Sequence, residues 1–124
     1  MPQRILVTDD NSAYRESILE LLQLEGFEVI EARNGKEAVE KVRDQKPDLI
    51  LCDVDMPIMD GFAVLAEIKA DLTTRNISFF LVTGRDDEES RARGKSLGAD
   101  DYITKPMDIN KLLTKIRQYL TKEE

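Results

Sequence analysis

The chain has 124 residues, 41% hydrophobic and 35% charged, which is typical of one soluble globular domain spanning residues 1–124. The formal net charge of −7 argues against nonspecific binding to nucleic acid or to an anionic membrane, because both are negatively charged themselves. The sequence shows no signal peptide and no apolar stretch of membrane-spanning length, and its one cysteine, Cys52, excludes an internal disulfide. We therefore expect a cytoplasmic protein with no direct nucleic-acid or membrane partner.

The first part of the chain predicts a strand, a helix and a second strand. Ile5–Thr8 is a short apolar run of the kind found in buried parallel strands. Asn11 or Ser12 can cap the helix that follows, and Gly26 is placed to end it. Phe27–Ala32 mixes apolar with acidic residues, as an edge strand does. The apolar residues of the helix recur at the spacing of one helix face: Tyr14, Ile18, Leu21 and Leu22.

The middle of the chain predicts two more strands and two more helices. A helix follows Asn34-Gly35 and stops before Pro47, because the residue before a proline disfavours the helical conformation. Asp48–Asp53 is the third predicted strand, and Ser78–Thr83 is the fourth and the most apolar. The apolar faces of the helices before and after the third strand are formed by Ala38, Val39 and Val42, and by Phe62, Leu65 and Ile68.

The last part of the chain predicts a polar helix, a short strand and an amphipathic helix. The polar helix runs from acidic to basic, which suits the helix macrodipole, but it has little to bury beyond Ala92 and Leu97. Its low apolar content predicts low local stability, which a switching element needs, and a merely solvated helix is the alternative. Asp100–Thr104 is the fifth strand, and Asp108 caps a final helix, leaving Thr121–Glu124 as a tail or the start of a linker. The apolar face of that helix is Ile109, Leu112, Leu113, Ile116 and Leu120.

Five strand–helix units with right-handed crossovers predict an α/β fold, a doubly wound parallel sheet of five strands with five helices. The first, third and fourth strands are the most apolar, so we place them at the centre and the second and fifth at the edges. The resulting strand order is 2-1-3-4-5, the order of flavodoxin-like folds.

Polar side chains follow the predicted strands at the edge where their carboxyl ends meet. Asp9 and Asp10 follow the first strand, and Asp53 ends the third. Thr83 ends the fourth strand, and Lys105 follows the fifth. Open α/β sheets place their sites at this edge, so we expect these side chains to converge. Three carboxylates so close together repel unless a cation neutralises them, and oxygen ligands without histidine or thiolate favour Mg²⁺ or Mn²⁺.

The same residues suit phosphoryl chemistry. Lys105 supplies positive charge for phosphoryl oxygens, and Thr83 supplies a hydroxyl donor. A carboxylate can attack phosphorus, and Asp53 is best placed to do so. The sequence contains no histidine, so a phosphohistidine donor must be another molecule or domain. The Lys105–Pro106 bond at a strand end is a candidate cis peptide.

Residues 53–61 read Asp-Val-Asp-Met-Pro-Ile-Met-Asp-Gly and resemble the phosphoacceptor loop of response-regulator receiver domains, the CheY-like family of two-component signalling. The resemblance extends over residues 4–120. It implies that Asp53 is the phosphorylated aspartate and that Asp9 and Asp10 organise Mg²⁺. It also implies two kinds of partner: a sensor histidine kinase or phosphotransfer protein, and a downstream output protein or fused effector domain. Such a domain modifies itself, so we do not expect a turnover enzyme.

The resemblance assigns roles to further positions. The backbone carbonyl of Asp55 is expected to complete the metal ligands, Thr83 to be the switch hydroxyl, and Lys105 to pair with the phosphoryl group. Tyr102 stands at the switch aromatic, whose ring turns inward as Thr83 moves; simple packing at an edge strand is the alternative. Asp55 and Arg85 lie two residues after the phosphoacceptor and the switch threonine, at positions that tune dephosphorylation in the family. We hypothesise that they pair and partly shield the acyl phosphate from water; two independent solvated charges are the alternative.

Two other functions compete with this interpretation. Asp53-Val54-Asp55 also fits the D-x-D motif of haloacid-dehalogenase-type phosphatases, but that family carries the motif on the first strand of a longer chain. Steady hydrolysis of phosphate monoesters would favour it. A pseudo-receiver that serves only as an interaction module is the third possibility, which failure to bind Mg²⁺ would favour. A dinucleotide-binding domain is disfavoured, because residues 9–12 follow the first strand without a G-x-G-x-x-G motif.

Overall fold

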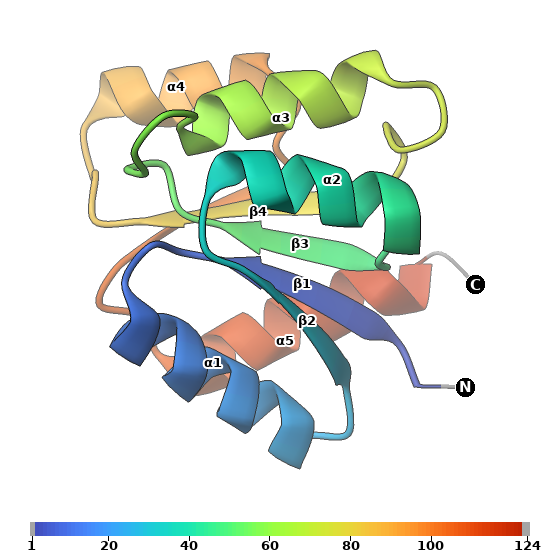
Figure 1. The fold of residues 1–124 in the computed structure, drawn as a ribbon. Helices are drawn as coiled ribbons and strands as arrows, with labels where there is room; N and C mark the ends of the chain where they lie inside the picture. The colour runs from blue at the N-terminus through green and yellow to red at the C-terminus, as the bar shows by residue number, and fades with distance from the viewer. Residues whose placement is uncertain (1, 123–124) are drawn as a thin grey trace.

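The fold is a parallel sheet between two layers of helices (Figure 1). The structure, a computed structural model, describes residues 2–122. The strands are β1 (Arg4–Thr8), β2 (Glu28–Ala32), β3 (Leu49–Cys52), β4 (Ser78–Thr83) and β5 (Asp101–Thr104). The helices are α1 (Ser12–Leu24), α2 (Gly35–Gln45), α3 (Gly61–Ala70), α4 (Glu88–Ser96) and α5 (Ile109–Lys122). The strand order is β2-β1-β3-β4-β5, which confirms the predicted order.

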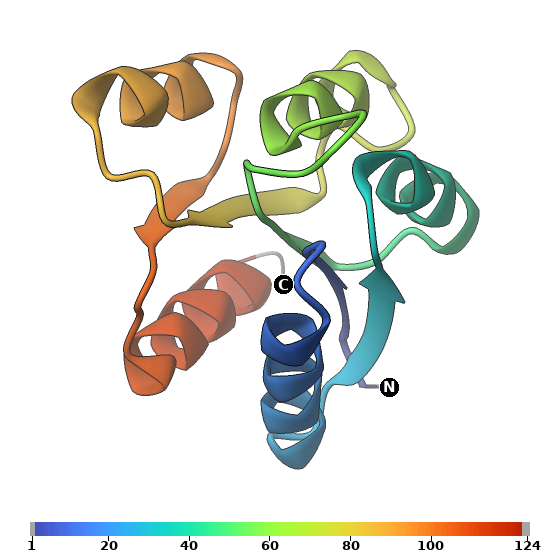
Figure 2. The same ribbon diagram turned by 60° about the vertical axis from the view of Figure 1, so that its left-hand side comes forward.

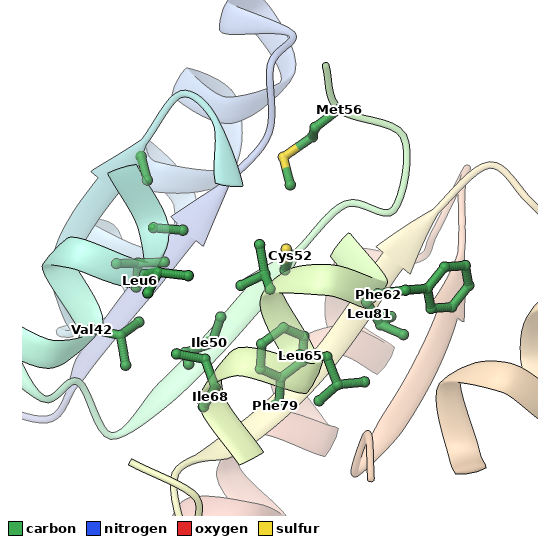
Figure 3. Close-up of a cluster of buried hydrophobic side chains, with 14 of the residues drawn as sticks. Leu6, Val42, Ile50, Cys52, Met56, Phe62, Leu65, Ile68, Phe79 and Leu81 are labelled. Atoms are coloured by element: carbon green, nitrogen blue, oxygen red, sulfur yellow. The ribbon is translucent and has the colours of Figure 1, made fainter. Parts of the chain in front are cut away.

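The helices divide between the two faces of the sheet. α1 and α5 cover one face, and α2, α3 and α4 cover the other (Figure 1 and Figure 2). Each face has its own hydrophobic cluster, because the side chains of a strand alternate between faces. The cluster under α2 and α3, drawn in Figure 3, includes Leu6, Ile50, Cys52, Phe62, Phe79 and Leu81. The cluster under α1 and α5 includes Ile5, Leu22, Leu51, Phe80, Leu112 and Ile116.

The burial of the strands follows their apolar content. Every residue of β3 and β4 is buried, whereas every residue of the edge strand β5 is partly exposed. The exposed positions of β2, the other edge strand, are its two glutamates, Glu28 and Glu31. Within residues 2–122, no helix combines the length and the apolar character needed to cross a membrane.

Asparagine caps keep two strand–helix turns short at the carboxyl edge of the sheet. The side chain of Asn11, rather than Ser12, accepts a hydrogen bond from the Tyr14 N–H (3.0 Å) at the start of α1. The side chain of Asn34 accepts one from the Glu37 N–H (2.9 Å) at the start of α2. Each cap satisfies a backbone donor that the first helical turn leaves free, so the loops at this edge need few residues.

Of the two residues predicted to be buried by helix α4, Leu97 is partly buried against the core, but Ala92 is not. Ala92 is exposed, and the helix turns Ser90 and Gly94 toward the sheet instead. A Cβ added at Gly94 would lie 2.8 Å from Leu81 Cδ1 and 3.1 Å from Tyr102 Cδ2. Because Gly94 has no Cβ, α4 packs closely on β4 and β5 through its backbone.

Two other expectations change. Leu21, predicted on the apolar face of α1, is 37% exposed, because the buried face of that helix is formed by Arg15, Ile18 and Leu22 and Leu21 lies beside it. Thr121 and Lys122, predicted in a tail or linker, belong to α5, because the last apolar residue of its face is still buried against the sheet. Glu123–Glu124, the rest of that predicted tail, lie outside the described residues.

Candidate functional site

Three carboxylates converge at the carboxyl edge of the sheet. The pairing of β1 with β3 sets Thr8 beside Cys52, and the Asp53 N–H donates to the Thr8 carbonyl (3.1 Å). Asp9 and Asp53 therefore leave neighbouring strands side by side. Ligand oxygens of Asp9, Asp10 and Asp53 lie within 4.8 Å of one another. Asp9 and Asp53 are only 3% and 8% exposed, whereas Asp10 is open to solvent.

The turn that carries Asp9 is held by hydrogen bonds on two sides. The Asn11 N–H donates to Asp9 Oδ1 (2.9 Å), and Nη1 of Arg15 donates to the Asp9 carbonyl (2.7 Å). Arg15 is buried and also donates through Nε to Glu31 Oε2 on β2 (3.1 Å). The sequence reasoning missed Arg15, although its place three residues before Ile18 puts it on the buried face of α1.

The loop after β3 positions Asp53 and Asp55. The Gly61 N–H donates to the Val54 carbonyl (2.9 Å), and the Asp55 N–H donates to Asp53 Oδ1 (3.3 Å). A Cβ at Gly61 would overlap the Asp53 backbone carbonyl, so this close approach requires glycine. The side chain of Asp60 caps α3 directly beside this turn. The loop is thereby tied both to the end of β3 and to the start of α3.

Lys105 reaches the acidic cluster from the loop after β5. Its backbone N–H donates to the Thr83 carbonyl (2.8 Å), and its peptide bond to Pro106, the cis candidate in the sequence, is cis. Its Nζ lies 2.8 Å from Asp9 Oδ2 and 3.4 Å from Asp53 Oδ2. Thr83 is fully buried at the end of β4. The residues predicted at this edge therefore lie in one place.

The charges of the site follow from burial and proximity. Burial raises the pKa of the Asp53 carboxyl; the positive charge of Lys105 opposes this shift, and the negative charge of Asp9 adds to it. Burial acts to lower the pKa of the Lys105 ammonium, but its hydrogen bond to Asp9 and the charge of Asp53 raise that pKa instead. Lys105 is therefore charged at neutral pH, and the three carboxylates still outnumber it. An all-oxygen donor set with excess negative charge fits a hard divalent cation such as Mg²⁺.

Asp55 and Arg85 form an ion pair at the rim of the site. Nε and Nη2 of Arg85 lie 2.8 and 2.6 Å from Asp55 Oδ1, and both side chains are about half exposed. They are therefore not two independent solvated charges. The Tyr102 hydroxyl donates to the Arg85 carbonyl (2.8 Å), and the Arg85 N–H donates to Thr83 Oγ1 (3.3 Å). Arg85 thus connects the loop after β4 to Asp55, to Tyr102 and to Thr83.

One aromatic side chain belongs to the site although the sequence assigns it only to a helix face. Nζ of Lys105 lies 4.1 Å from the centroid of the Tyr14 ring. No motif or spacing reveals this contact, because Tyr14 and Lys105 come from opposite ends of the chain.

The chain matches the family model described as the response regulator receiver domain over residues 5–117. The chain belongs to the response-regulator receiver family. This receiver is 38% identical over 120 residues to response regulator MprA of Mycolicibacterium vanbaalenii. It is 38% identical over 117 residues to the phosphate regulon transcriptional regulatory protein PhoB of Escherichia coli. These alignments cover 97% and 94% of the receiver but 51% of each relative, so the chain spans about half the length of the curated relatives it matches.

Solved structures share the fold of the receiver. The signal receiver domain of a signal transduction histidine kinase from Syntrophus aciditrophicus is 34% identical, with a TM-score of 0.90 over 97% of the receiver and 91% of that chain. A CheY-like receiver from Methanospirillum hungatei is 31% identical, with a TM-score of 0.93 over 98% and 96%. The receiver domain of sensor histidine kinase PA1611 from Pseudomonas aeruginosa is 26% identical, with a TM-score of 0.91 over 98% and 99%, and its structure has a magnesium ion coordinated in the active-site cleft. These likenesses confirm the predicted fold class and the predicted family of two-component signalling domains.

Proposed function

We propose that Asp53 accepts a phosphoryl group from a phosphohistidine of a sensor histidine kinase or phosphotransfer protein in the cytoplasm. The phosphorylated receiver then signals to an output protein or to a fused effector domain. The observation that carries this proposal is the position of the Asp53 carboxylate, buried between two acidic side chains and the ammonium of Lys105. Because these 124 residues contain no histidine, the phosphohistidine belongs to another molecule or to another domain.

Asp9, Asp10 and Asp53 would hold Mg²⁺ or Mn²⁺ through their carboxylates, together with the backbone carbonyl of Asp55. The fit is supported by oxygen atoms within 4.8 Å of one another and by their excess negative charge. When bound, the cation supplies positive charge that offsets the charge gathering on the phosphoryl oxygens.

In the transfer step, an oxygen of Asp53 forms a bond to phosphorus while the bond from phosphorus to the donor imidazole nitrogen breaks. The imidazole leaves with the electron pair of that bond. Nζ of Lys105, already 3.4 Å from Asp53 Oδ2, binds a phosphoryl oxygen, and the Thr83 hydroxyl donates to another. Hydrolysis of the acyl phosphate restores the Asp53 carboxylate. The receiver is thus itself modified and then reset, and it does not act as a turnover enzyme.

Thr83 and Tyr102 carry the switch in this proposal, through Arg85. Thr83 Oγ1 accepts from the Arg85 N–H, and the Tyr102 hydroxyl donates to the Arg85 carbonyl. A phosphoryl group that draws the Thr83 hydroxyl toward itself breaks the first contact and loosens the loop that the second contact holds. The equilibrium between two arrangements of this loop, α4 and β5 then shifts, because only one of them binds the phosphoryl group well.

The Asp55–Arg85 ion pair sets the lifetime of the phosphorylated form. Both side chains stand at the rim of the site and hold each other there at 2.6 Å. In this position they partly cover the acyl phosphate and exclude water from its open side.

Intact-mass spectrometry after incubation with Mg²⁺ and acetyl phosphate tests the proposed function, with Asp53→Asn as control. We expect one labile phosphate on the parent chain and none on the variant. Released phosphate is measured in the same tube. Steady turnover without an adduct would indicate a phosphatase, and neither adduct nor release, with Mg²⁺ binding lost as well, would indicate an interaction module.

A further inference from the structure

Lys105 has one partner at the site that carries no charge. Its ammonium lies over the face of the Tyr14 ring, 4.1 Å from the centroid. A cation at this distance from a ring face is attracted by the negative face of the ring quadrupole. The Lys105 side chain is only 22% exposed, so solvent screens this attraction little.

The other two partners of the Lys105 ammonium are carboxylates that would also bind the divalent cation. Asp9 and Asp53 contact Nζ at 2.8 and 3.4 Å, and both belong to the carboxylate cluster that fits a divalent cation. A cation bound to these carboxylates weakens their attraction for Lys105, because the charges then cancel. The attraction of the ring does not depend on the charge of the carboxylates. Tyr14 is therefore the contact that still holds the flexible lysine when its ion pairs weaken.

We propose that Tyr14 is a positioning residue, whose ring holds the ammonium of Lys105 in place to bind the phosphoryl group on Asp53. This inference rests on the proposed function. Holding the four-carbon side chain of Lys105 near Asp53 before transfer lowers the entropic cost of the contact in the transition state.

The ring, rather than the hydroxyl, carries this role. Among residues 2–122, the Tyr14 hydroxyl has no hydrogen-bond partner although it is buried. Tyr14 lines a small cavity together with Asp9, Asp53 and Met107. Phenylalanine would keep the ring face, whereas leucine would keep apolar bulk and remove the face.

The test compares Tyr14→Phe with Tyr14→Leu by the rate of phosphorylation with acetyl phosphate and Mg²⁺. We expect the leucine variant to be about fivefold slower, equivalent to about 1 kcal/mol, and the phenylalanine variant to match the parent. The Mg²⁺ dissociation constant, measured by calorimetry, should be the same in all three chains. A substitution that disrupted the whole site would change this constant. If the leucine variant does not fold, Tyr14→Met replaces it, because methionine has similar reach and no ring.

NMR reports the contact independently of phosphorylation. The ε-methylene protons of Lys105 should be shifted upfield by the ring in the parent and in Tyr14→Phe, and should lose that shift in Tyr14→Leu. A leucine variant phosphorylated as fast as the parent, or a phenylalanine variant as slow as leucine, would overturn the inference alone. A parent chain that takes no phosphate and binds no Mg²⁺ would overturn the proposed function, and with it this role of Tyr14.

Discussion

Replacing Asp53 by asparagine should stabilise the fold when no divalent cation is present. The substitution keeps the shape of the side chain and removes one of three charges that lie within 4.8 Å of one another. At an effective dielectric constant of about 20, each pair of these like charges costs about 3.5 kcal/mol at the outer limit of 4.8 Å, and the attraction of Lys105 at 3.4 Å offsets about 5 kcal/mol. Losing two repulsions and one attraction raises the free energy of unfolding by about 2 kcal/mol at pH 7.

Urea unfolding in EDTA, followed by circular dichroism, measures this difference. Asp44→Asn is the matched control, because Asp44 is an exposed aspartate on α2 away from the cluster and should change the free energy by less than about 0.5 kcal/mol. Mg²⁺ at about 100 times its dissociation constant should stabilise the parent by about 2.7 kcal/mol and Asp53→Asn by less, so the difference between them should narrow.

The gain in free energy of unfolding of Asp53→Asn over the parent should change with pH in a definite direction. Burial raises the pKa of folded Asp53 above its usual 3.8, so ionising this carboxyl destabilises the fold as the pH rises through the raised pKa. The advantage of Asp53→Asn should therefore disappear as the pH falls below that pKa. An asparagine variant less stable than the parent in EDTA at pH 7 would refute the electrostatic reasoning. An equal gain in Asp44→Asn would attribute the effect to net charge instead.

Two further substitutions test the ion pair at the rim of the site and the loop after β3. Arg85→Ala should shorten the lifetime of the phosphorylated form about threefold, the size of a half-exposed ion pair, while Arg43→Ala in a remote surface ion pair should not; equal lifetimes would disprove the shielding role. Ile58 is a β-branched residue at φ +71°, is 96% exposed, and stands in a three-residue turn closed by a 2.7 Å hydrogen bond between its neighbours. Ile58→Gly should raise the free energy of unfolding by about 1 kcal/mol in urea titrations, because it removes the backbone strain; a loss of stability would mean that the Ile58 side chain packs.

The strands and their order could be predicted because their signals are local. The apolar run of β4 is bounded by polar residues at Ser78 and Thr83, and the strand has the predicted bounds. Strand order followed from which runs lacked charge, since only buried strands can be apolar on both faces. The Asp55–Arg85 contact could be proposed from the resemblance to the receiver family, because the two residues stand two positions after the phosphoacceptor Asp53 and the switch threonine Thr83.

The contacts missed by the sequence depend on packing between distant segments. Arg15 lies on a helix face that otherwise reads as apolar, and its buried charge is explained only by Glu31 on β2 and by the Asp9 carbonyl. Gly94 reads as a weak point in a polar helix, and only the structure shows the side chains that fill the missing Cβ position. Propensity and spacing describe one segment at a time, so they cannot report such pairings.

The single thiol of the chain has a practical consequence for following the switch. Cys52 is fully buried in β3, and burial raises the pKa of its thiol well above the usual range, so little reactive thiolate exists at neutral pH. Ala92 points into solvent from α4. A cysteine introduced there by Ala92→Cys would take a maleimide dye in the presence of the native thiol, and the dye would report on α4 from outside the core. The parent sequence is therefore already suited to selective labelling.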